Sequence, residues 1–278
     1  MTGTEMLLDP AVAIPLIAVL LLSGAAIGVL AGLFGVGGGA ISVPVFYEAF
    51  LIQGNEPDIA MPVAVGTSLA MIVPTSIRSV RAHAAMGTVD VALLKAWVVP
   101  IIVGVALGSL LARHANASLF QTVFVFVAGV NAAKLLFAKG EWKLRDEMPG
   151  VMGTSLYGFM TGILAALMGI GAGAISNMIL TLNGRSIHEA VSTSAGVGVL
   201  IAIPGTVGYI LAGWGKPGLP FDAVGYVSVL ALAFTVPTAL LTARIGVSIA
   251  HGMSRDVLGR LFGVFLTLVC FRFLIALF

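Results

Sequence analysis

The feature that most constrains this chain is a succession of long apolar stretches. A helix that crosses the hydrocarbon core of a bilayer needs about 20 mainly apolar residues, because each residue adds about 1.5 Å. Eight stretches have about that length: Pro10–Phe34, Ile59–Ile77, Val91–Leu111, Leu119–Leu136, Val151–Met168, His188–Ala212, Ala223–Ala243 and Val257–Phe278. Two shorter stretches, Ala40–Ile52 and Ala174–Leu182, follow glycine clusters and predict short, tilted or re-entrant helices. The sequence therefore predicts an all-α polytopic membrane protein of about ten transmembrane segments, two of them short or broken.

The scarcity of charge supports this prediction. Charged residues make up 9% of the chain and hydrophobic residues 59%, whereas a soluble domain carries roughly 25% charged residues. Most of the surface must therefore face the lipid bilayer. The basic residues are spread among the predicted loops, so the sequence indicates no nucleic-acid partner. Cys270 is the only cysteine and the four histidines are scattered, so we expect no disulfide, metal site or cofactor.

The distribution of Lys and Arg predicts the orientation, because basic loops stay in the cytoplasm. With ten crossings and the N-terminus outside, most of the 14 Lys and Arg residues lie at the cytoplasmic face. Only Arg113, Lys216 and Arg272 then lie outside. The N-terminus lacks the basic region of a secretory signal, so the first apolar stretch is predicted to stay in the membrane. We expect both termini outside.

An internal repeat is the strongest evidence for the architecture. Gly28–Phe46 reads GVLAGLFGVGGGAISVPVF and Gly162–Leu180 reads GILAALMGIGAGAISNMIL, with ten identities in nineteen positions. The correspondence continues where Ala64-Val-Gly-Thr-Ser68 matches Ala190-Val-Ser-Thr-Ser194. The sequence therefore predicts an N-terminal transmembrane repeat (1–137), a cytoplasmic linker (138–150) and a C-terminal transmembrane repeat (151–278).

Each repeat holds five segments, and an odd number of crossings places the second repeat upside down relative to the first. Inverted repeats are frequent in secondary transporters, whose substrate site lies at the repeat interface near the middle of the bilayer. The alternative is an old duplication that is kept for packing alone.

The paired glycine motifs are the first candidate site. Glycine lets the backbone approach a ligand closely, and a chain break at membrane depth must line a cavity or be buried in protein. The N–H groups at the start of the following short helix would favour an anion. We therefore expect substrate-binding backbone at Gly37, Gly38, Gly39, Gly171, Ala172 and Gly173. The alternative is that these glycines only permit close helix crossing.

Polar side chains after the motifs are the second candidate set. Hydroxyl and amide groups can donate to the oxygens of a sulfonate or sulfite, or can instead satisfy backbone and neighbouring helices. The candidates are Ser42, Thr67, Ser68, Ser176, Asn177, Thr193 and Ser194. Arg78 and His83 are candidates for gating or coupling, with a cytoplasmic anchor as the alternative for both.

The chain resembles the TauE/SafE family of sulfite exporters, a group of small-anion permeases. The resemblance runs from about Gly24 to Phe273. It rests on Gly35–Ser42, Gly169–Ser176, the two Ala-x-x-Thr-Ser elements, His83 with Gly87-Thr-Val-Asp90, and Gly208–Gly215 through Gly218-Leu-Pro220 to Gly225-Tyr-Val227. The second motif departs from the first: Ala172 replaces the middle glycine, and Asn177 and Met178 stand where the first repeat has Val43 and Pro44. The two repeats are therefore expected to contribute unequally to binding.

The resemblance implies secondary transport of a small sulfur-containing anion, namely sulfite, sulfoacetate or a related C2 organosulfonate, across a bacterial-type cytoplasmic (inner) membrane. Protons are one candidate for the coupling ion. A passive small-anion channel is the alternative function. A membrane enzyme is disfavoured, because the sequence shows no nucleophile–base pair, paired carboxylates or metal cluster, and a membrane assembly or sensor subunit is the remaining alternative.

Overall fold

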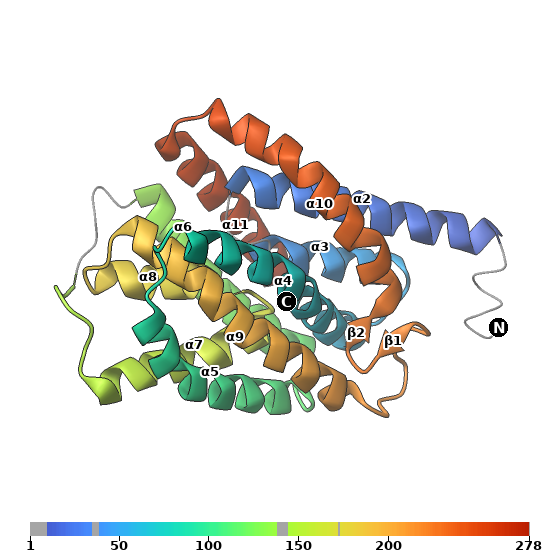
Figure 1. Cartoon of the computed structure of the whole chain (residues 1–278). Coiled ribbons are helices and arrows are strands. Elements are labelled where there is room, and N and C mark those ends of the chain that lie inside the picture. The colour runs from blue at the N-terminus through green and yellow to red at the C-terminus, as the bar shows by residue number, and fades with distance from the viewer. Residues whose placement is uncertain (1–9, 35–38, 138–143, 172, 278) are drawn as a thin grey trace.

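The computed structural model describes residues 10–34, 39–137, 144–171 and 173–277. Within these ranges the chain folds into ten helices and one two-stranded hairpin (Figure 1). The helices are α2 (Pro10–Phe34), α3 (Gly39–Ile52), α4 (Pro57–Ala85), α5 (Val91–Ala112), α6 (Ala117–Phe137), α7 (Val151–Met168), α8 (Gly173–Leu182), α9 (Ile187–Gly213), α10 (Val229–His251) and α11 (Arg255–Leu277). The strands are β1 (Ala223–Val224) and β2 (Val227–Ser228).

Eight of these helices are long and apolar enough to cross a membrane, as predicted. The two short helices, α3 and α8, also lie where the sequence placed them. At about 1.5 Å per residue they extend for only about 21 Å and 15 Å, less than the roughly 30 Å of a hydrocarbon core. The prediction of a polytopic helical membrane protein with two short segments is confirmed.

Three boundaries differ from the prediction by more than two residues: the end of α4, the start of α10 and the end of α10, which continues to His251 beyond the predicted Ala243. Helix α4 continues to Ala85, beyond the predicted end at Ile77, so Arg78 and His83 are helical. The predicted span from Ala223 was wrong at its start, because α10 begins only at Val229. The residues before it form the hairpin, in which Ala223 pairs with Ser228. Gly225 makes the turn with a φ of 58°, a left-handed conformation that glycine adopts without strain.

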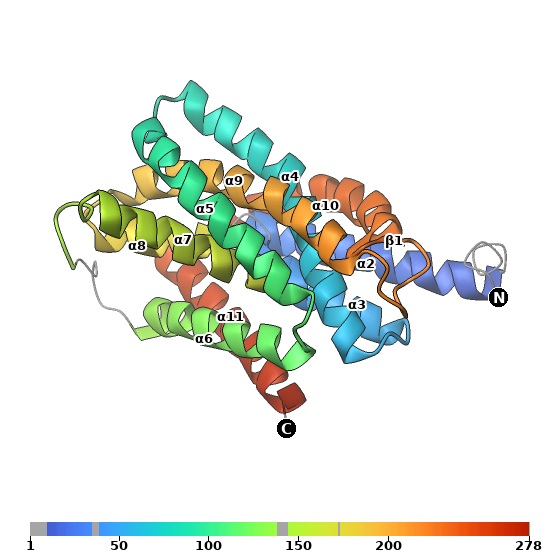
Figure 2. The same ribbon diagram turned by 90° about the horizontal axis from the view of Figure 1, so that it is seen from below.

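The most extensive helix contacts keep the same pattern when the two halves of the chain are exchanged. In chain order, α2–α6 correspond to α7–α11. Helix α2 packs along α10 (Figure 1), and its counterpart α7 packs along α5, the counterpart of α10. Helix α4 packs against α9, and α6 against α11 (Figure 2). This pattern supports the duplication, whereas the inversion of the halves and the division at 138–150 stay predictions.

Glycines allow the closest helix crossings. A Cβ atom on Gly28 of α2 would lie 2.3 Å from the carbonyl oxygen of Ala239 on α10. A Cβ atom on its repeat counterpart, Gly162 of α7, would lie 2.5 Å from the carbonyl oxygen of Ile101 on α5. Small residues let membrane helices pack backbone to backbone, so each of these pairs joins one helix from each half at close range.

Helix α4 lies at the centre of the protein. In its most apolar 18-residue window 72% of the residues are buried, against 44% or less in the corresponding windows of the other candidate spans. Ala60–Leu69 is buried without interruption. Thr67 and Ser68 belong to this segment, so their hydroxyl groups must find partners inside the protein.

We predict that Gly28→Ala lowers the stability of the folded protein by about 1–3 kcal/mol, because the new methyl group overlaps the α10 backbone. The measurement is the midpoint of thermal unfolding in detergent. Gly129→Ala on α6 is the control, because no atom lies within 4 Å of its added Cβ. That substitution is expected to leave stability unchanged or to raise it by up to about 1 kcal/mol. Equal midpoints for both variants would contradict the close crossing.

Candidate functional site

The described ends of the two glycine motifs meet inside the protein. A Cβ atom on Gly39 would lie 2.7 Å from the backbone nitrogen of Gly171 and 2.8 Å from the Cα atom of Ile170. Gly39 and Gly171 are buried, and Gly173 at the start of α8 is half-buried. The predicted site residues Gly37, Gly38 and Ala172 lie outside the described residues.

A pair of hydrogen-bonded serines follows each motif. The Oγ atoms of Ser42 and Ser68 are 2.6 Å apart, and they join α3 to α4. In the second half Ser176 donates to Ser194 over 2.9 Å, and this bond joins α8 to α9. The two pairs occupy corresponding positions of the repeat, and all four side chains are buried. The duplication is therefore visible at the level of single hydroxyl groups.

The hydroxyl protons of these pairs are used within the protein. Ser68 donates to the carbonyl oxygen of Gly169 over 2.7 Å, Ser42 donates to that of Gly39 over 3.3 Å, and either hydroxyl can be the donor in the contact between them. Ser194 donates to the amide oxygen of Asn177, and Ser176 donates to Ser194. In this conformation all four hydroxyl groups have partners within the protein, and their contact with substrate stays a prediction.

Asn177 differs from the serines in this respect. Its side-chain oxygen accepts from Ser194, while its NH₂ group has no partner among the described residues. The side chain is half-buried on α8. An amide NH₂ carries two donor hydrogens. Asn177 is therefore the side chain at this place with free donors for an anion.

Thr67 and Thr193 have a matching structural role. Thr67 Oγ1 accepts from the backbone N–H of Ser228 over 3.0 Å, and Thr193 Oγ1 accepts from that of Asp90 over 3.0 Å. Ser228 and Asp90 are the N-cap residues of α10 and α5, which are counterparts in the repeat. Each threonine therefore fixes the start of a helix from the opposite half.

The two gating candidates lie at one end of α4. His83 is 15 residues beyond Ser68, which corresponds to about 22 Å along the helix axis. Its Nδ1 atom lies 3.1 Å from Ser192 Oγ, which also accepts from Thr88 Oγ1 over 2.8 Å. Arg78 is exposed and has no hydrogen-bond or ion-pair partner among the described residues. The structure thus shows no contact of either residue with the described ends of the glycine motifs.

An ion pair that lies next to His83 was not predicted from the sequence. Arg185 lies 2.9 Å from Asp90 and 2.8 Å from Glu189. The pair with Glu189 has the spacing i, i+4 and could have been found from the sequence. The pair with Asp90 joins the two halves of the chain, and only the folded structure brings these residues together.

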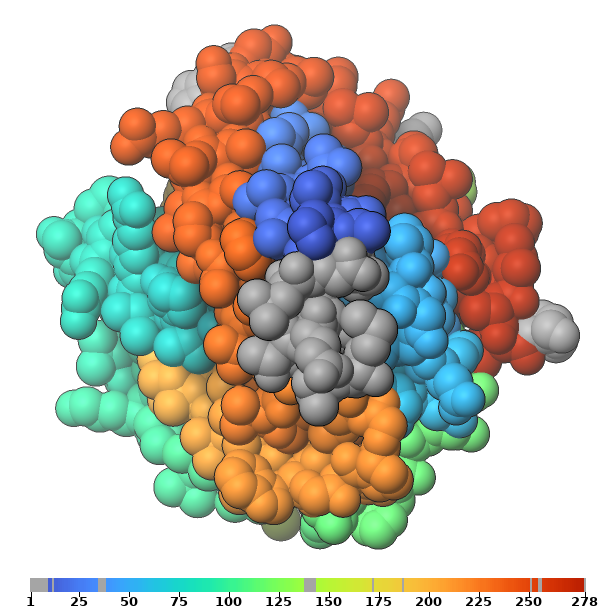
Figure 3. Space-filling model, turned by 90° about the vertical axis from the view of Figure 1, so that its right-hand side faces the viewer, coloured from blue at the N-terminus to red at the C-terminus, as the bar shows by residue number. Residues whose placement is uncertain are grey.

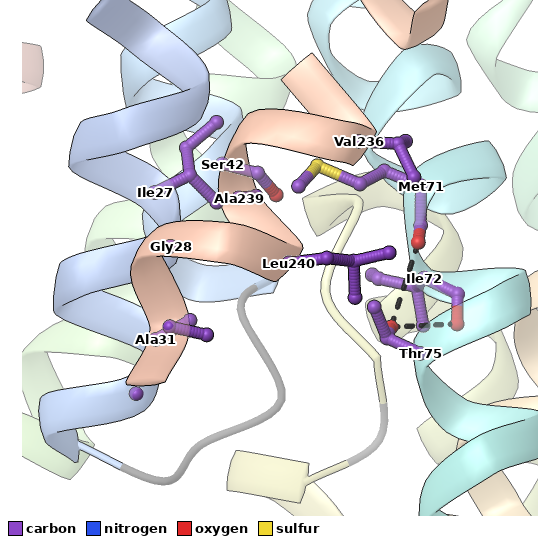
Figure 4. Close-up of a pocket in the computed structure, with 12 residues that line it drawn as sticks. Ile27, Gly28, Ala31, Ser42, Met71, Ile72, Thr75, Val236, Ala239 and Leu240 are labelled. Atoms are coloured by element: carbon purple, nitrogen blue, oxygen red, sulfur yellow. Dashed lines mark hydrogen bonds between the residues drawn. The ribbon is translucent and has the colours of Figure 1, made fainter. Parts of the chain in front are cut away.

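A cavity of about 170 Å³ lies beside the first serine pair, between α2, α3, α4 and α10 (Figure 4). Ser42 and Met71 lie at one end of the view and Thr75 at the other. The wall is otherwise apolar, with Ile27, Ala31, Ile72, Val236, Ala239 and Leu240 among its residues. Thr75 donates to the carbonyl oxygen of Ile72 over 2.9 Å. Among the described residues, no charged side chain lines this cavity.

Among the described residues, no group of three or more His, Cys, Asp or Glu side chains could hold a metal ion.

We predict that Thr67→Val lowers stability by about 1–3 kcal/mol, because it leaves the buried N–H of Ser228 without an acceptor. Thr67→Ser keeps the acceptor oxygen and is the matched control. Thermal unfolding in detergent, in the absence of any substrate, checks both. A Thr67→Val protein with the wild-type midpoint would show that the threonine is not needed to hold α10.

Comparison with known proteins adds an independent line of evidence. The model of the family described as sulfite exporter TauE/SafE matches residues 20–273. A probable membrane transporter protein of Haemophilus influenzae is 30% identical over 253 residues, which cover 90% of this chain and 94% of that protein. A probable membrane transporter protein of Methanocaldococcus jannaschii is 28% identical, with 90% and 93% covered. No solved structure matches the chain.

Proposed function

Because the chain belongs to the sulfite exporter TauE/SafE family, we propose that it is a secondary transporter of a small sulfur-containing anion. The proposed substrates are sulfite, sulfoacetate or a related C2 organosulfonate, and the proposed mechanism is alternating access across the cytoplasmic membrane. One observation carries the proposal: Gly39 and Gly171, each from the glycine motif of a different half, meet inside a membrane protein.

The proposed site is the place where α3 and α8 begin. The first N–H groups of a helix lack partners within that helix and carry partial positive charge. Helix starts therefore attract anions without a charged side chain. Two such starts follow the paired motifs, and the NH₂ group of Asn177 adds two further donors. The serine pairs hold these groups in position by the hydrogen bonds described above.

The neighbouring cavity supports a substrate with a short apolar part. Its volume of about 170 Å³ is close to that of an engineered apolar protein cavity that accepts benzene, about 150 Å³. Its wall offers few polar groups to a fully hydrated ion. A C2 organosulfonate could place its carbon atoms against Ile27 and Ala239 and its sulfonate group toward the glycine motifs.

The energy source is proposed to be an ion gradient, with protons as the candidate coupling ion. Glu48 on α3 is paired with Arg272 of α11 at 3.0 Å. His83 is the proposed proton-carrying side chain, because an imidazole can take up and release a proton and its Nδ1 atom lies 3.1 Å from Ser192 of the other half.

The test is substrate flux into liposomes that contain the purified protein. We expect saturable uptake of sulfoacetate, accelerated by an imposed pH gradient, with about 1–10³ molecules per second per protein. Sulfite, thiosulfate, taurine and sulfate serve as competitors that rank the anions. Much faster, non-saturating flux would indicate the channel instead, and no flux of any anion would refute transport of this class.

We further predict that Asn177→Leu lowers the uptake rate by about tenfold or more, because it removes the free NH₂ donors; a lost hydrogen bond to a charged group corresponds to about 1.5–3 kcal/mol. Asn131→Leu is the matched control. Asn131 donates to the carbonyl oxygen of Val127 within α6, away from the glycine motifs. Equal uptake by the two variants, both folded as judged by thermal unfolding, would remove Asn177 from the proposed site.

A further inference from the structure

The two ends of the protein contain turns that correspond in the repeat. The α3–α4 turn carries Gly54 at a φ of 86°, and the α8–α9 turn carries Gly184 at a φ of 84°. In the first turn the N–H of Asn55 donates to Phe50, and in the second the N–H of Arg185 donates to Leu180. Asn55 and Arg185 therefore occupy equivalent positions in the two halves.

The helix starts that face these turns also correspond. Asp90 caps α5 and is bound by Thr193, while Ser228 caps α10 and is bound by Thr67. Each end of the molecule therefore has a junction between a turn of one half and a helix cap of the other. We call them the Arg185 junction (Arg185 with Asp90) and the Asn55 junction (Asn55 with Ser228).

The two junctions occupy equivalent positions in the repeat, but they differ in the charge of their side chains. At the Arg185 junction an ion pair of 2.9 Å joins the two halves, and the contacts of Ser192 with Thr88 and His83 reinforce it. At the Asn55 junction neither side chain is charged.

A cavity of about 490 Å³ lies at the Asn55 junction instead. Gln53, Asn55, Asp222 and Ser228 line it together with α2. Figure 3 looks onto this end, where the start of α2 (blue) lies between the α3–α4 region (light blue) and the orange part of the chain. The Asp222 carboxylate accepts from Ser228 Oγ and from the backbone of Leu230. One end of the protein is thus held together by an ion pair between the two halves, and the corresponding end contains a cavity.

We propose that the Arg185–Asp90 ion pair is the closed gate of this conformation and that the cavity at the Asn55 junction is its open mouth. The inference rests on the proposed alternating access. A partly exposed ion pair suits a gate because solvent screening keeps it weak enough to break in each cycle. Arg185 is 38% exposed and Asp90 16%. Because Asn55 and Ser228 cannot form such a pair, opening the gate and closing the mouth are energetically distinct steps.

The test locks the gate in a Cys270→Ser background, which removes the only native thiol. Asp90→Cys/Arg185→Cys is joined by a reducible bifunctional thiol reagent, and sulfoacetate flux is measured in liposomes. We expect the cross-link to abolish flux and a reductant to restore it. Arg185→Cys/Glu189→Cys is the matched control, because it places the same reagent within one half. Its flux should not change on cross-linking.

A second measurement does not depend on cross-linking. Asn55→Cys reports on the mouth through its rate of reaction with a polar thiol reagent in nanodiscs. Adding Asp90→Asn breaks the ion pair and should lower that rate by about two- to fivefold, as expected for the loss of a partly exposed pair. Adding Glu189→Gln, which leaves Asp90 in place, should not.

The outcomes separate the two proposals. If the unmodified protein shows no anion flux, the proposed function fails. If flux is present but persists after Asp90→Cys/Arg185→Cys is cross-linked, or if Asp90→Asn leaves the reaction rate at Asn55→Cys unchanged, the gate is refuted and the transport function stands.

Discussion

The protein depends on satisfying the polar backbone where two membrane helices are interrupted. Lipid offers no hydrogen bonds, so a chain break at membrane depth persists only where protein or a lined cavity satisfies it. Here the two breaks lie against each other: Gly39 approaches Gly171, and Ser68 of the first half donates to the Gly169 carbonyl of the second. Neither half could hold its interruption alone, and this mutual dependence brings both short helices to one place.

The hydroxyl groups around this place divide into two tasks. The paired serines bind the short helices to α4 and α9, and the threonines bind the caps of α10 and α5. Hydrogen bonding therefore links the centre of the protein to both of its ends. A movement at the glycine motifs would be passed through α4 and α9 to the two junctions, because these helices carry both kinds of contact.

Much of this could be predicted from the sequence. Long apolar stretches and the repeated GAIS segment led to the helices, to the two short elements and to the meeting of the glycine motifs. The start of α10 was missed, because Ala223–Ser228 is apolar enough to continue a helix and only Gly225 marks the turn. The serines were predicted either to bind substrate or to satisfy neighbouring groups; the structure shows hydrogen bonds to neighbours, and substrate contact stays a prediction. Such pairings depend on distances between segments more than 15 residues apart, which hydrophobic patterning does not report.

The close crossing of α2 with α10 affects how the protein is made. Gly28 packs against the backbone of Ala239, which comes more than 200 residues later in the chain. Likewise, α5 packs against α7, which is synthesised after it. During synthesis α2 therefore enters the bilayer with its glycine surface unpaired, and it stays so until α10 has been made. A truncated chain that ends after the first repeat would contain α2 and α5 without their packing partners α10 and α7. Cellular quality control could recognise such a chain by these two unpaired helix surfaces.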